Sequence, residues 1–132
     1  MSDNTVRFEL KIPVEKGSVN AIDLLADHCE LSRQQIKQAM SKGAVWLQKG
    51  KRTQRLRRAT KNLNSGELLQ LYYDKRLLDQ TPVPPKLLHD FGAYSVWFKP
   101  AGMLAQGTEW GDHCSLLRVS ELAFAKTRQS FL

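Results

Sequence analysis

The first part of the chain alternates apolar with charged residues. Apolar side chains stand at every second position from Val6 to Ile12, and charged side chains fill the positions between them. A period of two is typical of a β-strand that buries one face. Pro13 and Gly17 follow, and residues of these types end the predicted strand.

From Asn20 onward the apolar residues recur with the period of a helix. Asn20 is a good N-cap, and Asp23 falls in the first turn, near the positive end of the helix dipole. Four residues then share one apolar face: Ile22, Leu25, Ala26 and Cys29. The pattern predicts an amphipathic helix in which Cys29 fills part of the core.

A second helix is predicted directly after Ser32. Ser32 and Gln35 have the spacing of a capping box, and Leu31 and Ile36 have the spacing of a hydrophobic staple. Gly43 suits the left-handed backbone position that follows the last turn of a helix. These signals fix both ends of the predicted helix.

Shorter strand and turn signals fill the rest of the chain. They predict a strand over 44–47, a turn over 48–51, extended or irregular chain over 52–60, a strand over 68–73, a stiff spacer over 79–85, a strand over 93–98 and a last helix capped by Ser115. The predicted fold class is α+β. Residues 1–76 form a small domain of two helices on a short antiparallel sheet, 77–86 a proline-rich linker, and 87–132 a mainly β segment.

Charge is distributed unevenly along this pattern. The chain has 132 residues, with 20 Lys and Arg against 13 Asp and Glu. The stretch 31–66 contains no acidic residue and ten basic ones: Arg33, Lys37, Lys42, Lys49, Lys51, Arg52, Arg55, Arg57, Arg58 and Lys61. Such a segment repels itself unless an anion lies against it, so its sign indicates a polyanionic partner, most commonly nucleic acid. The alternative is a solvated basic face that only aids solubility.

Other classes of protein are disfavoured by the composition. No run of 18 apolar residues is present, and the N-terminus lacks the features of a secretory signal, so we expect a cytoplasmic protein without a membrane span. Cys29 and Cys114 are too few for a disulfide scaffold. The adjacent pairs His28–Cys29 and His113–Cys114 lack the usual spacing of metal ligands, so we expect no metal site.

The order of capped helices, glycine, strand and lysine-glycine turn resembles a known RNA-binding family. From 20 to 73 the chain is similar to the small domain named after small-subunit ribosomal protein four (the S-four-type domain). The residues that carry the resemblance are Ala21-Ile22-Asp23-Leu24-Leu25, Leu31-Ser32-Arg33, Lys42-Gly43-Ala44-Val45, Leu47-Gln48-Lys49-Gly50-Lys51 and Asn64-Ser65-Gly66-Glu67. The resemblance implies that the second helix and the following turn bind structured RNA (rRNA or tRNA), with all ten basic residues as candidates. Trp46 is interpreted as a core residue, with base stacking as the alternative.

A second resemblance begins after the prolines. Leu88-His89-Asp90, then Tyr94-Ser95-Val96-Trp97-Phe98-Lys99-Pro100-Ala101-Gly102-Met103 and Gln106-Gly107, looks like the opening of the catalytic domain of Rlu-type pseudouridine synthases. That family commonly carries the S-four-type domain just upstream. The resemblance implies isomerisation of uridine in RNA, a target base that leaves its stack, and no metal or organic cofactor. Lys99 and Pro100 would remain from one wall of the pocket.

The sequence departs from that family at the catalytic residue. The family's aspartate lies in an arginine-leucine-aspartate motif downstream of the lysine-proline turn, and 103–132 contains no such motif. Arg76-Leu77-Leu78-Asp79 has an extra leucine and precedes the turn, while Glu109, Asp112 and Glu121 are interpreted as surface carboxylates. We therefore expect the N-terminal part of a synthase, with no catalytic residue in these 132. The alternatives are a non-enzymatic RNA- or ribosome-binding protein and a basic module for acidic protein partners.

Overall fold

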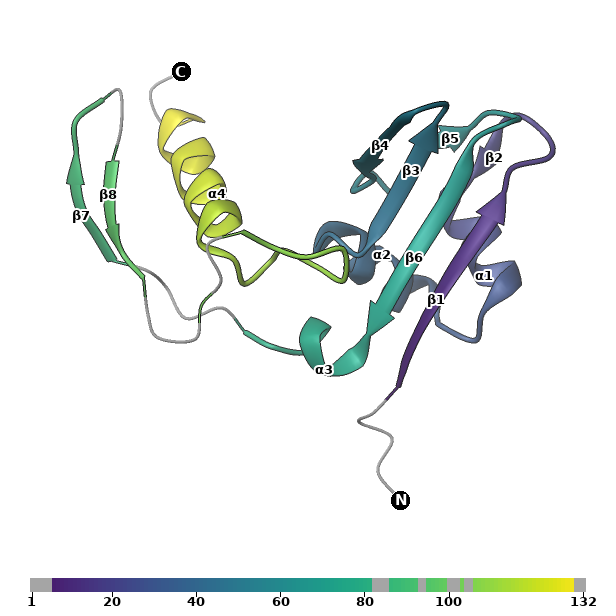
Figure 1. Ribbon diagram of the computed structural model, residues 1–132, viewed down its shortest axis with the longest axis horizontal. Helices are drawn as coiled ribbons and strands as arrows, with labels where there is room; N and C mark the ends of the chain where they lie inside the picture. Colours follow the sequence, from purple (N-terminus) through teal and green to yellow (C-terminus); the bar gives the residue numbers. More distant parts are fainter. Residues whose placement is uncertain (1–5, 82–85, 93–94, 100–102, 104–105, 130–132) are drawn as a thin grey trace. The chain divides into compact units, whose positions relative to one another are not determined.

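The computed structural model describes residues 6–81, 86–92, 95–99, 103 and 106–129. The chain divides into two compact units, and we call Met1–Asp79 with Glu109–Gly111 the first unit, and Gln80–Thr108 with Asp112–Leu132 the second. The fold is α+β, with four helices and antiparallel sheets among the described residues (Figure 1). No described helix combines the length and the hydropathy that crossing a bilayer requires.

A four-stranded antiparallel sheet is the framework of the first unit. Its strands, in spatial order, are β1 (Arg7–Pro13), β6 (Leu68–Asp74), β3 (Val45–Lys49) and β4 (Arg52–Arg55). Leu10 lies opposite Leu71, and Leu71 lies opposite Val45 on its other side. This order places β1 and β4 at the two edges of the sheet. A separate two-stranded sheet pairs β2 (Val19–Asn20), between β1 and α1, with β5 (Asn62–Leu63), between β4 and β6.

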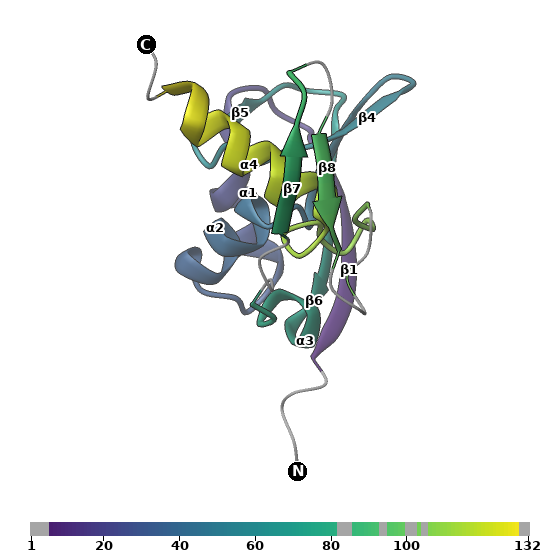
Figure 2. The same cartoon turned by 90° about the vertical axis from the view of Figure 1, so that its left-hand side faces the viewer.

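Two helices cover one face of this sheet, which we call the inner face. They are α1 (Ala21–His28) and α2 (Arg33–Ser41), and both lie on the same side of β1 and β6 in Figure 2. The predicted caps are confirmed: Asn20 Oδ1 accepts from the Ile22 N–H at 2.9 Å, and Ser32 and Gln35 form both bonds of the capping box. A short helix, α3 (Lys75–Leu78), follows β6.

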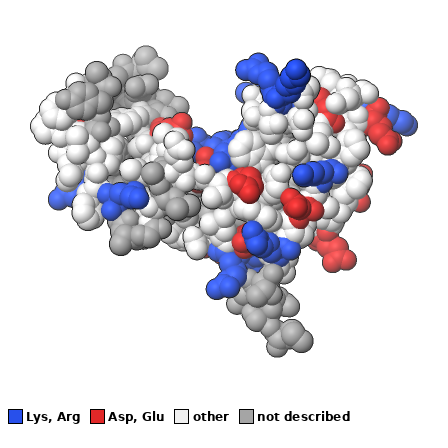
Figure 3. All heavy atoms as spheres, viewed as in Figure 1, with Lys and Arg blue, Asp and Glu red and all other residues white. Residues whose placement is uncertain are grey.

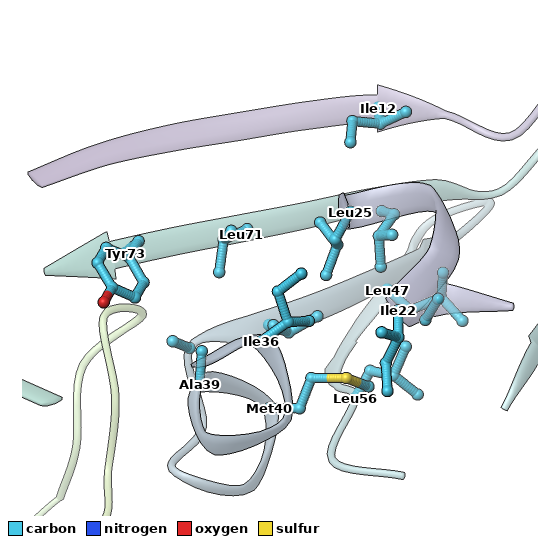
Figure 4. Packing of buried hydrophobic residues seen from close by; sticks show 14 of the residues in the cluster. Ile12, Ile22, Leu25, Ile36, Ala39, Met40, Leu47, Leu56, Leu71 and Tyr73 are labelled. Atoms are coloured by element: carbon cyan, nitrogen blue, oxygen red, sulfur yellow. The ribbon is translucent and has the colours of Figure 1, made fainter. Parts of the chain in front are cut away.

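The core of the first unit lies between the inner face and the helices. Figure 4 shows Leu71 and Leu47 from the sheet facing Leu25 of α1 and Ile36 and Met40 of α2. These five side chains are almost completely buried. Burial of each contributes about 1.5–3 kcal/mol, so packing outweighs the low helix propensity of these short segments.

The second unit contains a hairpin and a longer helix. Strands β7 (Lys86–Asp90) and β8 (Ser95–Phe98) pair antiparallel, and the connection includes Gly92 at φ 86°. Helix α4 (Leu116–Gln129) begins after Ser115, whose Oγ accepts from the Arg118 N–H at 3.2 Å, as predicted. Several large apolar side chains of the hairpin and helix are exposed: Leu87, Leu88, Phe91, Val96, Phe98, Leu117 and Leu122.

Candidate nucleic-acid interface

Helix α2 presents the first two cations of the basic stretch. Arg33 and Lys37 are one helical turn apart and both are exposed, because the opposite face of the helix carries Ile36 and Met40 into the core. Arg33 Nη1 lies 2.6 Å from an Asp23 carboxylate oxygen of α1, and both side chains are more than half exposed. A solvated ion pair of this kind contributes little stability, so a phosphate can compete for Arg33 at small cost.

The β3–β4 turn holds a second group of cations. Gly50 has φ 60°, as a tight turn requires, and the Gln48 side-chain amide donates to its carbonyl at 3.2 Å. Lys49, Lys51 and Arg52 are exposed around this turn. Lys and Arg side chains gather over the turn at the top of Figure 3, whereas the rest of that face carries both signs of charge. Lys49 is also 3.5 Å from the Glu67 carboxylate.

A loop from Leu56 to Lys61, which we call the anchored loop, carries the last three cations. The Leu56 N–H donates to the Val45 carbonyl at 2.8 Å, which fixes the start of the loop against β3. Arg57 Nη1 donates to the Ser41 carbonyl at 3.1 Å, at the C-terminal end of α2. A guanidinium is well placed there, because the last carbonyls of a helix lack intrahelical donors and carry the negative end of the dipole.

The other end of the anchored loop is fixed to the start of α1. Asn20 Nδ2 donates to the Ala59 carbonyl at 3.2 Å, and the Ala21 N–H donates to the Lys61 carbonyl at 3.3 Å. The Lys61 N–H donates to the Arg58 carbonyl at 3.3 Å, which closes a tight turn. The loop is therefore bonded to the C-terminus of α2 and to the N-terminus of α1, and its two remaining cations flank a defined turn.

Three of the predicted cations are used within the fold. Arg55 donates to the Gly43 carbonyl, and its guanidinium lies 4.3 Å from the centre of the Trp46 ring. Lys42 Nζ donates to the Leu78 carbonyl at 2.6 Å, and Arg57 holds α2 as described. The prediction treats all ten cations alike, but the structure gives these three a role in packing.

Arg33 and Lys49 form the ion pairs described above, so five of the ten cations remain whose charged groups have no partner among the described residues. They are Lys37, Lys51, Arg52, Arg58 and Lys61. They come from α2, the β3–β4 turn and the anchored loop. The first and last of them, Lys37 and Lys61, are 24 residues apart in the sequence. In the fold, β3 leads from α2 to the turn, and hydrogen bonds join the anchored loop to β3 and to α2. We call these five the free cations.

The interpretation of Trp46 as a core residue is wrong. Its side chain is half-buried on the outer face of the sheet, opposite the helices, and its Nε1 donates to the Glu109 carbonyl at 2.9 Å. Trp110 packs edge-to-face on Tyr72, with ring centres 5.5 Å apart, and Arg7 lies 4.1 Å from the centre of the Trp110 ring. The alternation in β3 gives a signal for this, because Val45 and Leu47 point inward and Trp46 therefore points outward.

Two pKa values are shifted among the described residues, and both belong to groups outside these cations. Burial raises the pKa of the Tyr73 hydroxyl, and the charge of Asp79 raises it further. The pKa of Lys75 is raised mainly by its hydrogen bond to the Asp79 carboxylate, at 2.5 Å. Both shifts favour the protonation state that these groups already have at neutral pH.

The structure describes only some of the candidate residues in the segment that resembles the synthase catalytic domain. Lys99 is exposed, and Pro100 lies outside the described residues. Glu109 belongs to the first unit through its bond with Trp46, whereas the Asp112 carbonyl accepts from Ser115 within the second unit. No cluster of three potential metal ligands occurs among the residues that the structure describes.

Comparisons of the chain with protein families, with curated proteins and with solved structures found no match.

Proposed function

We propose that the first unit binds structured RNA through the free cations. The observation that carries this proposal is the anchored loop, which is bonded to both helices and holds Arg58 and Lys61 on a fixed backbone. Phosphate contacts that position a nucleic acid need cations on rigid supports. The stretch 31–66 contains no carboxylate, and the carboxylates of Asp23 and Glu67 pair with Arg33 and Lys49 and not with the free cations, so none of these pairs competes with a phosphate at the free cations.

Folded RNA suits this surface better than an unpaired strand. Single-strand binding relies on exposed aromatic rings on which bases stack, and the stretch 49–61 contains no aromatic residue. Trp46, the aromatic residue nearest in sequence, has Arg55 over its ring. Cations spread over a helix, a turn and a loop instead match the separated phosphates of a double-stranded or folded RNA.

The resemblance of 20–73 to the S-four-type domain and of 86–122 to the Rlu-type opening supports a specific role for that binding. We propose that the chain contributes the RNA-binding part of a pseudouridine synthase that acts on ribosomal or transfer RNA. Glu109 and Asp112 give no support for catalysis, since Glu109 is exposed and Asp112 is half-buried in a different unit. A non-enzymatic RNA- or ribosome-binding protein would use the same free cations.

Salt-dependent binding tests the RNA proposal. In Arg58→Ala/Lys61→Ala, each lost phosphate contact should reduce the slope of log Kd against log salt by roughly 0.7 to 0.9 and weaken binding to many RNAs. The matched control is Lys16→Ala/Arg76→Ala, which removes the same charge from exposed positions outside the basic stretch. Equal affinity and slope for wild type and the Arg58/Lys61 variant, or equal losses in both variants, would refute the proposed surface.

Tritium release from 5-tritiated uridine in ribosomal and transfer RNA tests the enzymatic part. We expect the 132-residue chain to bind these RNAs without turnover, because it lacks the motif that supplies the family's aspartate. Turnover that is abolished by Asp112→Asn or Glu109→Gln would show that the active site is misassigned.

A further inference from the structure

Among the described residues, strand β1 forms an open edge of the four-stranded sheet (Figure 1). Three hydrogen bonds at the ends of β1 show which of its residues direct their backbone N–H and C=O groups toward β6. The Lys75 N–H donates to the Val6 carbonyl at 3.0 Å, the Val14 N–H to the Glu67 carbonyl at 2.8 Å, and the Gly66 N–H to the Val14 carbonyl at 2.9 Å. Because successive residues of a strand direct their backbone groups to opposite sides, the even-numbered residues of β1 bond with β6. The N–H and C=O groups of Arg7, Glu9 and Lys11 therefore point to the open edge.

Pro13 agrees with this assignment. It occupies an odd-numbered position at the end of β1, where the N–H that proline lacks would point away from β6. Proline is found in sheets at such edge positions because no ladder hydrogen bond is lost there. The open edge thus offers backbone groups over most of a seven-residue strand, and an edge of this kind is a template for pairing with another strand.

Two hollows flank the inner side of the same strand. The larger, of about 530 Å³, is lined by Phe8 and Leu10 of β1 together with Cys29, Leu31 and Tyr73. The smaller, of about 300 Å³, is lined by Ile12 and Val14 with Val19 and Leu24. His28, at the end of α1, lines both hollows. Phe8 and Leu10 remain half-exposed, so the apolar inner side of β1 is covered incompletely by its own chain.

We propose that two copies of this chain pair through β1, antiparallel and with Leu10 opposite Leu10 of the second copy. This register places Glu9 opposite Lys11 twice and Phe8 opposite Ile12 twice. The backbone groups of Glu9 and Lys11 then face each other as hydrogen-bonded pairs. At each end Arg7 lies opposite Pro13, whose carbonyl accepts a hydrogen bond but which has no N–H to donate. Neither Glu9 nor Lys11 has an ion-pair partner among the described residues of its own chain.

Charge and strand overlap together select this register over its neighbours. A pair centred on Glu9 would set Glu9 against Glu9 and Arg7 against Lys11, and like charges directly opposite each other destabilise a sheet. A pair centred on Phe8 would also set Arg7 against Glu9, but it would overlap over 7–9 alone and leave Lys11 and Ile12 without partners in the other strand. The register centred on Leu10 gives opposite charges on the outer face and apolar pairs on the inner face.

The hollows fit the side chains that this pairing brings. Phe8 of the second copy comes to lie opposite Ile12, beside the smaller hollow, and Ile12 of the second copy lies opposite Phe8, beside the larger one. β4 forms the opposite edge of the sheet, so the cations of the β3–β4 turn are left free in both copies. The pairing therefore does not depend on RNA, and its test requires none.

Exchanging the two charges tests the register. Glu9→Lys alone and Lys11→Glu alone each set two like-charge pairs in the dimer and should raise its dissociation constant about tenfold or more. An equimolar mixture of the two variants should form a heterodimer, because each Lys then lies opposite a Glu. The double variant Glu9→Lys/Lys11→Glu should dimerise like wild type. Sedimentation velocity of the full chain, with one variant fluorescently labelled, measures all four species.

Both positions are exposed, so at a concentration where all chains are monomeric the variants should unfold at the same temperature as wild type, and a thermal scan checks this. A wild-type chain that is monomeric at about 0.5 mM would overturn the proposal, and an extended peptide of another protein would then be the better occupant of this edge. Single variants that dimerise as tightly as wild type, or a mixture that dimerises no better than the single variants, would overturn the Leu10-centred register.

Discussion

Asn20 joins the two parts of the RNA-binding surface, and replacing it should affect stability and binding together. Its Oδ1 accepts from the N–H groups of Ile22 and Asp23 at 2.9 and 3.4 Å, while its Nδ2 donates to the Ala59 carbonyl at 3.2 Å. One side chain therefore caps α1 and holds the anchored loop.

The two contributions can be separated with two substitutions. Asn20→Ala removes the cap, which costs about 1 kcal/mol, and leaves a partly buried carbonyl unpaired, which costs about 1 kcal/mol more. Asn20→Ser keeps a capping oxygen and loses only the bond to Ala59, so it should cost about 1 kcal/mol. For a unit of this size, each 1 kcal/mol lowers the Tm by roughly 4–8 °C.

Circular dichroism during thermal unfolding measures the first effect, and salt-dependent RNA binding measures the second. We expect Asn20→Ser to bind RNA more weakly than wild type although α1 is still capped, because Arg58 and Lys61 lose their fixed backbone. Asn64→Ala, at an exposed turn position, is the control for losing an asparagine. If Asn20→Ser matched wild type in both Tm and affinity, the bond to Ala59 would not be what holds the loop.

Three further predictions follow from other contacts. Trp110→Ala removes the edge-to-face contact with Tyr72 and should destabilise the first unit by about 1–2 kcal/mol in urea unfolding, whereas Trp110→Phe should recover part of this loss. Gly43→Ala forces a residue with a Cβ to φ 88° and should cost about 1 kcal/mol, and an unchanged midpoint would contradict the helix end described for α2. Limited digestion with a protease of broad specificity should cut near 81–86 and leave the first unit resistant, since the second unit exposes much apolar surface; equal resistance of both units would count against that boundary.

Local signals explain why α1, α2, α4 and the β3–β4 turn were predictable, whereas the short helix α3 was not predicted. The capping box of α2 involves Ser32 and Gln35, three residues apart, and Gly43 follows the same helix closely, so neighbouring residues suffice to specify both ends. The domain boundaries proposed from the sequence remain a prediction. The structure adds that a distant segment, 109–111, packs with the first unit, for which the local sequence gives no signal.

The roles of individual cations could not be predicted in the same way. Arg57 reaches the carbonyl of Ser41, and Lys42 reaches that of Leu78, over separations of 16 and 36 residues in the sequence. Such pairs depend on how strands and helices pack, and charge patterning along the chain does not contain that information. Sequence reasoning therefore identified the basic stretch as a whole but could not separate its free cations from those that hold the fold.

The return of Glu109–Gly111 to the first unit has a consequence for synthesis of the protein. The outer side of the sheet gains Trp110 only when that residue has left the ribosome, after 80–108 has been made. At about 5–20 residues per second, this leaves an interval of a few seconds in which the helices and strands can assemble while Tyr72 lacks its aromatic partner. During translation, the first unit therefore completes its packing later than a domain whose chain is continuous.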